Sequence, residues 1–253
     1  MKQFSDLYAQ YYDLLYQDKD YQYEVDYVDR LIRNSKNPVN TILDIGCGTG
    51  KHAEIFCTKG YKVHGIDVSE DMLKVAQNRC YGKEEVLSFS HSSIQNLMLE
   101  KKFDVVISLF HVMSYQSNNE DLIKAFKVVK NHLNDGGVFI FDFWYGPAVL
   151  TDLPIVRSKK LENDKVKVTR LATPSLSAQS NTANVDFDIF IENKDDGQIL
   201  KMQESHDMRY FFDFELEMIC KKVGLSIEKK YEWMSDKSPD FGSWYVVWVL
   251  KAS

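Results

Sequence analysis

The sequence lacks several features that mark particular classes of protein. Only four of its 253 residues are cysteines, and none belongs to a C-x-x-C pair, so the spacing indicates neither a zinc site nor a disulfide framework. No apolar run approaches the length that spans a membrane, and the polar first residues contain no hydrophobic signal segment. We therefore expect a cytoplasmic protein with no metal centre and no membrane partner.

The chain also has no excess of basic residues. Its 31 lysines and arginines are outnumbered by 37 acidic residues, which leaves a net charge of −6 and argues against a nucleic-acid partner. With 44% hydrophobic and 27% charged residues, the composition is that of an ordinary globular protein. The length fits one large α/β domain with an elaboration, so we predict a single domain over residues 1–253.

An apolar, β-branched run followed by closely spaced glycines occupies residues 41–50, TILDIGCGTG, and a helical pattern begins at Lys51. This order of strand, tight turn and helix is the opening unit of a doubly wound α/β sheet. A dinucleotide fingerprint would need glycine at Lys51, and a P-loop would need glycine at Ile45 and Ser or Thr at His52. No G-x-S-x-G string of a hydrolase occurs either. The glycines therefore indicate a ligand-binding loop of another kind, whose backbone lies directly against the ligand.

Hydrophobic periodicity divides the rest of the chain into helices and strands. It predicts two helices between residues 4 and 33, and further helices at 51–59, 69–80, 118–133 and 213–223. It predicts strands at 61–67, 86–89, 103–109, 138–143, 225–231 and 244–250. Residues 156–208 alternate like strands, with a turn at 195–197 and no crossover helix, so these strands are predicted to be antiparallel.

Four regions follow from these patterns: a helical cover (1–38), a core (39–150), an antiparallel insert or lid without a core of its own (151–208), and a last helix with two strands (209–253). Ser69 is a natural N-cap, and Asp213 is expected to cap the last helix. The string NDGG at residues 134–137 is expected to stop the preceding helix, and residues 144–147 read as a turn.

The strings LDIGCGTGKH, GIDVSEDML, FDVVISLF and NDGGVFIFDFW resemble the class I S-adenosylmethionine-dependent methyltransferases. With the N-terminal YYDLLYQDKDY, the insert and the RYFFDFELEMICKKVGL helix, the layout is similar to bacterial N,N-dimethyltransferases of nucleotide-linked amino sugars and to relatives associated with surface polysaccharides. The resemblance implies an α/β fold with a doubly wound, Rossmann-like seven-stranded sheet. It also implies S-adenosylmethionine as the cofactor and a small-molecule acceptor.

The resemblance assigns the cofactor to the glycine loop and to the strand ends beside it. The loop would hold the amino-acid end and the ribose, and Asp67 would accept hydrogen bonds from both ribose hydroxyls. Ser93 stands where many relatives have Gly-Asp, so the backbone of Ile94 is an alternative contact for adenine. The expected cofactor-binding residues are Asp44, Gly46, Cys47, Gly48, Thr49, Gly50, Asp67, Val68, Met72, Ser93, Ile94 and Leu109.

Polar and aromatic residues near strand ends are the candidates for the reaction itself. The expected catalytic residues are His111, Tyr115 and Tyr145, and the expected acceptor contacts are Tyr12, Tyr16, Trp144, His206 and Arg209. His111 follows the fourth strand, where this fold commonly faces the methyl group, but a lone histidine is also a frequent structural residue. Arg209 either clamps an anionic acceptor or pairs with an acid. The N-terminal tyrosines either cover the site or form a packed helix face.

Three functions stay open at this point. Methyl transfer from a sulfonium is an in-line displacement that needs positioning and desolvation more than a particular base. N-methylation of a nucleotide-linked amino sugar or another surface-polysaccharide precursor is slightly favoured. O-methylation of a phosphorylated, phosphoramidate or carboxylate capsule precursor is the alternative, because Phe4 and Tyr115 replace residues that relatives use for the acceptor. The third hypothesis is a non-catalytic S-adenosylmethionine-binding regulator. The protein is expected to be a monomer or a homodimer.

Overall fold

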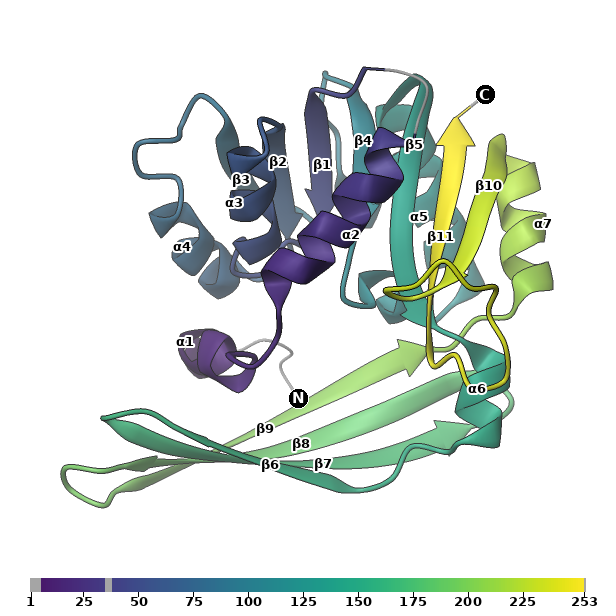
Figure 1. Cartoon of the computed structure of the whole chain (residues 1–253). Helices are drawn as coiled ribbons and strands as arrows, with labels where there is room; N and C mark the ends of the chain where they lie inside the picture. The colour runs from purple at the N-terminus through teal and green to yellow at the C-terminus, as the bar shows by residue number, and fades with distance from the viewer. Residues whose placement is uncertain (1–5, 35–37, 253) are drawn as a thin grey trace.

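The computed structural model describes residues 6–34 and 38–252, with side chains from Tyr11 onward. Its core is a seven-stranded sheet in the order β10-β11-β5-β4-β1-β2-β3 (Figure 1). The strands are β1 (Thr41–Ile45), β2 (Lys62–Asp67), β3 (Leu87–His91), β4 (Phe103–Ser108), β5 (Leu133–Trp144), β10 (Leu225–Glu232) and β11 (Tyr245–Ala252). β11 runs antiparallel to β5 and β10, and the pairs among β1 to β5 are parallel. The predicted Rossmann-like sheet is confirmed.

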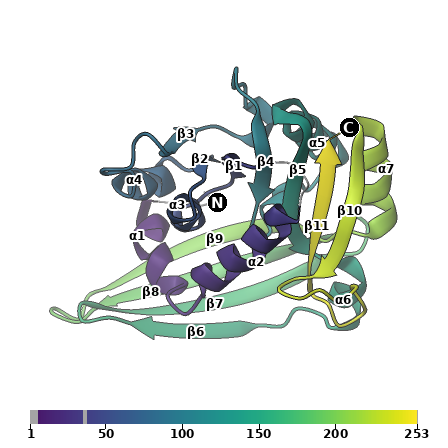
Figure 2. The same cartoon turned by 45° about the horizontal axis from the view of Figure 1, so that its top comes forward.

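Helices cover both faces of this sheet (Figures 1 and 2). The helices are α1 (Asp6–Leu15), α2 (Tyr21–Arg33), α3 (Lys51–Thr58), α4 (Glu70–Asn78), α5 (Asn119–His132), α6 (Gly146–Thr151) and α7 (Asp213–Val223). On β5, Phe139 and Phe141 pack with α5 and α7, whereas Val138 and Ile140 pack with α2 and α3. Successive side chains of a strand point to opposite faces, which is why the unbroken apolar runs of β4 and β5 form buried central strands.

Three predicted boundaries need correction. Glu215 Oε1 accepts the backbone N–H of Phe212 at 2.9 Å, and Asp213 is already the first residue of α7, so the predicted Asp213 cap is wrong by one residue. Residues 134–137 belong to β5 as a bulge: Leu133 pairs with Phe103, and regular pairing resumes at Val138. The predicted turn at 144–147 is the end of β5 and the start of α6, because proline suits the first turn of a helix.

The insert forms a second sheet of four antiparallel strands, as predicted. Its strands are β6 (Arg157–Glu162), β7 (Val166–Ser177), β8 (Thr182–Asn193) and β9 (Ile199–Arg209). Figure 1 shows this sheet below the core sheet, with α1 between them. One part of its inner face is apolar and packs on Leu15 of α1 and Met72 of α4. The insert therefore buries part of its apolar face against the N-terminal cover and α4.

Candidate active site

A cavity of about 760 Å³ lies where the carboxyl ends of β1, β2 and β4 meet α1 and the insert. In a parallel sheet this edge is where ligands bind, because the loops that follow the strands open there. Its lining comes from every part of the fold: the glycine loop, the ends of β2, β4 and β5, α1, and the inner face of β7, β8 and β9. A volume of this size suits a ligand larger than a single sugar ring.

The glycine loop has a backbone that side chains would disturb. Gly46, Gly48 and Gly50 have φ angles of 74°, 53° and 76°, a region that favours glycine. A Cβ on Gly46 would stand 2.5 Å from Val112 Cγ1, whereas a Cβ on Gly48 would meet no described atom within 4 Å. Gly48 also lines the cavity, so its bare backbone leaves room for a ligand. The alternating glycines thus serve two needs, a tight turn and close approach.

Asp67 is fixed at the end of β2 by two backbone donors. Its Oδ2 accepts the N–H of Gly48 at 2.8 Å, and its Oδ1 accepts the N–H of Ser69 at 2.9 Å. Burial raises the pKa of Asp67, while the hydrogen bonds from Ser69 and Gly48 oppose that rise. Asp67 lines the cavity, and a carboxylate has lone pairs beyond these bonds with which it can accept hydrogen bonds from a diol.

Asp44 provides a second carboxyl behind the loop. It is 2% exposed, and its Oδ2 has no hydrogen-bond partner within the described part of the chain. Burial, with a smaller contribution from the negative charge of Asp67, raises the pKa of Asp44 to about 7. Two acids beside one loop repel a phosphate and suit a ligand that brings an ammonium group and hydroxyls. These two acidic acceptors fit the ammonium group and the ribose hydroxyls of S-adenosylmethionine. They do not fit the phosphates of a dinucleotide.

The expected cofactor residues divide into two groups by position. Those that line the cavity are Gly46, Cys47, Gly48, Thr49, Asp67, Val68, Met72, Ile94 and Leu109. Asp44, Gly50 and Ser93 are outside the lining: Asp44 lies within β1, Gly50 is the N-cap of α3, and Ser92 takes the place expected for Ser93. For those three, direct contact with the cofactor is not supported by position.

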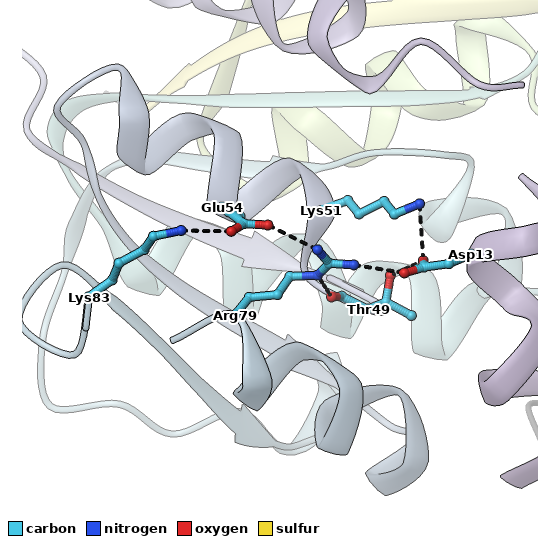
Figure 3. A network of polar contacts seen from close by, with 6 residues as sticks. All are labelled: Asp13, Thr49, Lys51, Glu54, Arg79 and Lys83. Atoms are coloured by element: carbon cyan, nitrogen blue, oxygen red, sulfur yellow. Dashed lines mark hydrogen bonds and ion pairs between the residues drawn. The ribbon is translucent and has the colours of Figure 1, made fainter. Parts of the chain in front are cut away.

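Asp13 ties the N-terminal helix to the glycine loop (Figure 3). Its Oδ1 accepts the hydroxyl of Thr49 at 2.8 Å, and its Oδ2 accepts Nη2 of Arg79 at 2.7 Å. Arg79 Nε donates to the carbonyl oxygen of Thr49 at 2.7 Å, and Lys51 Nζ lies 3.3 Å from Asp13 Oδ1. Arg79 also bonds Glu54 at 3.0 Å. The cover and the cofactor loop are therefore held together by one polar network, which sequence patterns did not predict.

Replacing Asp13 by Asn should loosen this cover and weaken cofactor binding by less than about tenfold, because a partly exposed ion pair contributes about 1 kcal/mol. Hydrogen exchange of residues 11–16 and calorimetry of cofactor binding measure the two effects. Asp26→Asn is the matched control, because it breaks an ion pair between Asp26 of α2 and Lys59 at the end of α3. Unchanged exchange in Asp13→Asn would mean that packing alone holds α1.

His111 follows β4 and is held by Asp142, a buried aspartate of β5. Its Nδ1 lies 2.6 Å from Oδ2 of Asp142, although the ring N–H is not aligned on that oxygen as a hydrogen bond. Its backbone N–H donates to the same oxygen at 3.2 Å, and its ring stacks on Tyr245 with centroids 4.6 Å apart. His111 and Phe110 have φ angles of 63° and 66°, a strained pair of left-handed residues. The histidine lines the cavity, so a role as base and a role as a structural post both stay open.

Tyr115 meets the insert through a buried histidine. Its Oη is 2.8 Å from Nδ1 of His206, and Nε2 of His206 is 3.2 Å from Oε2 of Glu204. The Glu204 and His206 side chains are 0% and 3% exposed. Tyr115 and His206 were predicted from the sequence as site residues, whereas Glu204 was not. A signal was present, since Met202, Glu204, His206 and Met208 alternate along β9 and share its buried face.

The expected acceptor residues separate in the same way. Tyr12, Tyr16, Trp144 and His206 line the cavity. Arg209 is outside the lining, and so is Tyr145, which was predicted to be catalytic; each follows a lining residue, Met208 or Trp144, by one position, which reverses the face of a strand. Arg209 binds Asn119 at 2.8 Å and Glu215 at 2.6 Å, which matches the ion-pair alternative. Tyr145 packs against the apolar core. Phe4 lies outside the described residues.

Two arginines of the insert line the cavity and were missed. They are Arg157 on β6 and Arg170 on β7. Arg170 Nη1 donates to Oη of Tyr16 at 3.0 Å, and its guanidinium lies 4.9 Å from the ring centroid of Phe187. Arg170 continues the face of β7 that carries Val166 and Val168, so an arginine on an alternating apolar face was the signal.

Comparison with known proteins gives the family. Residues 42–137 match a family model described as a methyltransferase domain. An uncharacterized protein of Methanocaldococcus jannaschii is 31% identical over 229 residues, which cover 90% of this chain and 76% of that protein. A dTDP-3-amino-3,4,6-trideoxy-alpha-D-glucopyranose N,N-dimethyltransferase of Streptomyces venezuelae is 27% identical over 222 residues, 87% of this chain and 90% of the relative. A structure of a S-adenosylmethionine-dependent methyltransferase from Clostridium acetobutylicum shares the fold, with a TM-score of 0.83, 24% identity and 98% coverage of both chains.

Residues 42–137 of the chain belong to the methyltransferase domain family, and the chain is an enzyme of the S-adenosylmethionine-dependent methyltransferase class. The predicted enzyme class and cofactor are thereby confirmed, against the alternative of a non-catalytic regulator. No helix within residues 6–34 and 38–252 is both long and apolar enough to cross a membrane. Among the same residues, no group of three or more His, Cys, Asp or Glu side chains is arranged to hold a metal ion.

Proposed function

We propose that this enzyme methylates the amino nitrogen of a nucleotide-linked amino sugar. The observation that carries the proposal is the continuity of one cavity from Asp67 and the glycine loop to Arg157 and Arg170 on the insert. Arginine matches the geometry of phosphate oxygens, so the insert end suits the diphosphate of a nucleotide-linked ligand. The similarity to N,N-dimethyltransferases named for dTDP-linked amino sugars supports the same substrate class.

The chain's own residues would bind, orient and desolvate. S-adenosylmethionine supplies an electrophilic methyl group when bound. Asp67 and the glycine loop would hold the ribose and the amino-acid end, and Asp44, behind the loop and outside the cavity lining, would act on the ammonium group through its charge and not by direct contact. Tyr16 and Phe110, whose rings meet edge to face with centroids 5.1 Å apart, would exclude water from the reacting nitrogen. A lone pair on nitrogen then attacks in line, which requires positioning more than a strong base.

O-methylation remains a second candidate because of one observation, the His111 and Asp142 pair. A hydroxyl nucleophile needs a base, and a histidine oriented by a buried carboxylate can provide one. If His111→Ala lowers turnover a hundredfold or more with cofactor binding intact, O-methylation gains support. If turnover barely changes, the positioning of an amine is the better account.

The direct test incubates the enzyme with S-adenosylmethionine and matched pairs of dTDP-linked sugars that carry an amino or a hydroxyl group. Mass spectrometry should detect one and then two added methyl groups on the amino sugars alone. Methylated protein or RNA without a small-molecule product would contradict the proposal. The proposal includes a small-molecule acceptor and no nucleic-acid partner. It also includes a cytoplasmic location and a monomeric or homodimeric state.

Replacing Arg170 by Gln should raise KM for the nucleotide-linked sugar about tenfold or more, because a hydrogen bond between charged groups contributes about 1.5–3 kcal/mol. The same variant should leave KM for the free amino sugar nearly unchanged. Steady-state kinetics with both acceptors measures this split. Lys167→Gln, an exposed residue on the same strand, is the control. An equal rise in KM for both acceptors would mean that Arg170 does not bind the diphosphate.

A further inference from the structure

We propose that Tyr115, His206 and Glu204 form a proton relay that leads from the reacting nitrogen into the insert. The inference rests on the proposed N-methylation, because an amino sugar arrives mostly as an ammonium ion and must lose a proton before it can attack. It assigns a role to Glu204, a carboxyl that is completely buried in the insert and that the positioning of cofactor and acceptor does not use.

The three side chains follow one another from the cavity inward. Tyr115 ends the short 3-10 helix Val112–Tyr115 after β4 and lines the cavity. His206 stands behind it at 2.8 Å between Tyr115 Oη and Nδ1, and Glu204 stands behind His206 at 3.2 Å between Nε2 and Oε2. His206 and Glu204 are two residues apart on β9, so the period of a strand puts both on the same buried face.

The order of donors sets the direction of proton flow. In the proposed relay Glu204 acts as a carboxylate, which only accepts hydrogen bonds, so the tautomer of His206 that fits both contacts has its hydrogen on Nε2. Nδ1 is then the acceptor for the O–H of Tyr115. The tyrosine oxygen would in turn accept an N–H from the acceptor in the cavity. The arrangement is like that of other acid–base groups in enzymes: Tyr115 is hydrogen-bonded to His206, and His206 is in turn oriented by Glu204.

The proton step balances within the three residues. The N–H bond of the acceptor ammonium breaks, and its electron pair stays on nitrogen for the attack on the methyl group. That proton passes to the oxygen of Tyr115 while the tyrosine hydroxyl proton passes to Nδ1 of His206. The resulting imidazolium lies against Glu204, which offsets its charge. Burial raises the pKa of Tyr115, so tyrosine hands the proton on without storing a negative charge.

Charged and aromatic side chains from neighbouring elements surround Tyr115 and His206. Tyr16, which directly follows α1, Asp67 of β2 and Glu204 of β9 all disfavour ionisation of Tyr115 through their charges. Phe187 of β8 meets the His206 ring edge to face, with centroids 5.2 Å apart. Arg170 of β7 lines the same cavity and lies over Phe187. Glu204 is thus the carboxylate at hydrogen-bonding distance from the imidazole, and it is the residue whose charge the test must remove.

The test compares the pH dependence of kcat in the wild type, Glu204→Gln and Tyr115→Phe, with a dTDP-linked amino sugar as acceptor. Both variants should lower kcat about a hundredfold or more near pH 7, the range of general acid–base catalysis. The loss should shrink as the pH rises and the amine arrives already neutral. Calorimetry should show unchanged binding of S-adenosylmethionine. Asp207→Asn, on the opposite face of β9, is the matched control and should keep the wild-type profile.

A wild-type pH profile in Glu204→Gln would overturn the relay while leaving the proposed function in place. Failure of the wild type to methylate any amino sugar would overturn the proposed function itself, and with it the relay. If Glu204→Gln does not fold or bind the cofactor, Tyr115→Phe carries the same test, since phenylalanine keeps the ring and removes only the hydroxyl. A uniform loss at every pH in Tyr115→Phe would assign positioning to the tyrosine and contradict proton transfer.

Discussion

Replacing Asp67 by Ala should weaken binding of S-adenosylmethionine by about one to two orders of magnitude. Hydrogen bonds to a charged group contribute about 1.5–3 kcal/mol, and the variant loses the acceptor for both ribose hydroxyls. It also loses the bonds that hold the N–H groups of Gly48 and Ser69, so the loop itself becomes less ordered. Isothermal titration calorimetry with the cofactor and with its demethylated product measures the change.

Glu70→Ala provides the control for this experiment. Glu70 is in the first turn of α4, close in sequence to Asp67, and its side chain is 71% exposed. The control should keep wild-type affinity, since Glu70 is outside the cavity lining. If Asp67→Ala binds the cofactor as tightly as the wild type, Asp67 is not part of the cofactor site, and its hydrogen bonds serve only the loop.

Local patterns in the sequence predicted most of the core sheet. Strand β1 follows from an apolar run that ends at glycine, β2 from a run that ends at an acid, and β4 from a continuous apolar run. Ser69 caps α4 as expected, accepting the N–H of Met72 at 3.3 Å. The errors have local causes as well. Residues 134–137 have turn-forming composition and have no partner in the register with β4; they form an irregularity within β5 between the paired residues Leu133 and Val138.

The site was harder to predict because strand parity decides which side chains face a cavity. Arg209 and Tyr145 were each one position away from a residue that lines it, and one position in a strand reverses the face. Glu204 and Arg170 lie on the correct faces but interrupt apolar patterns, so they were overlooked. The contact of Asp13 with Arg79 joins α1 to the residue that follows α4, and periodicity alone contains no information about such a pairing.

Replacing Asp44 by Asn should stabilise the cofactor-free enzyme at alkaline pH. Burial raises the pKa of Asp44 in the folded chain to about 7, against an ordinary value of 3.8 for an exposed aspartate. Between these values the folded state keeps a proton that the unfolded state has lost, so the contribution of Asp44 to stability falls as the pH rises from about 4 to about 7 and is constant above. The total loss is up to about 4 kcal/mol, at 1.36 kcal/mol for each unit.

Asn cannot ionise, so the variant should lack this decline. Denaturant unfolding of both proteins at several pH values between 5 and 8 gives the difference in unfolding free energy, which should grow as the pH rises. Asp71→Asn, in the first turn of α4 and outside the cavity lining, is the control and should follow the wild type. A difference that does not depend on pH would mean that Asp44 is ionised throughout this range.

The instability that Asp44 causes should disappear when the cofactor binds. A positive ammonium group close to Asp44 favours the carboxylate, so binding near pH 6 should release a proton from Asp44. Calorimetry in buffers of different ionisation enthalpy counts the protons released, and Asp44→Asn should release fewer and bind more weakly. Equal proton counts in the two proteins would place the ammonium group away from Asp44. A buried acid that destabilises the empty fold and is neutralised by its ligand is a cost that evolution retains at functional sites.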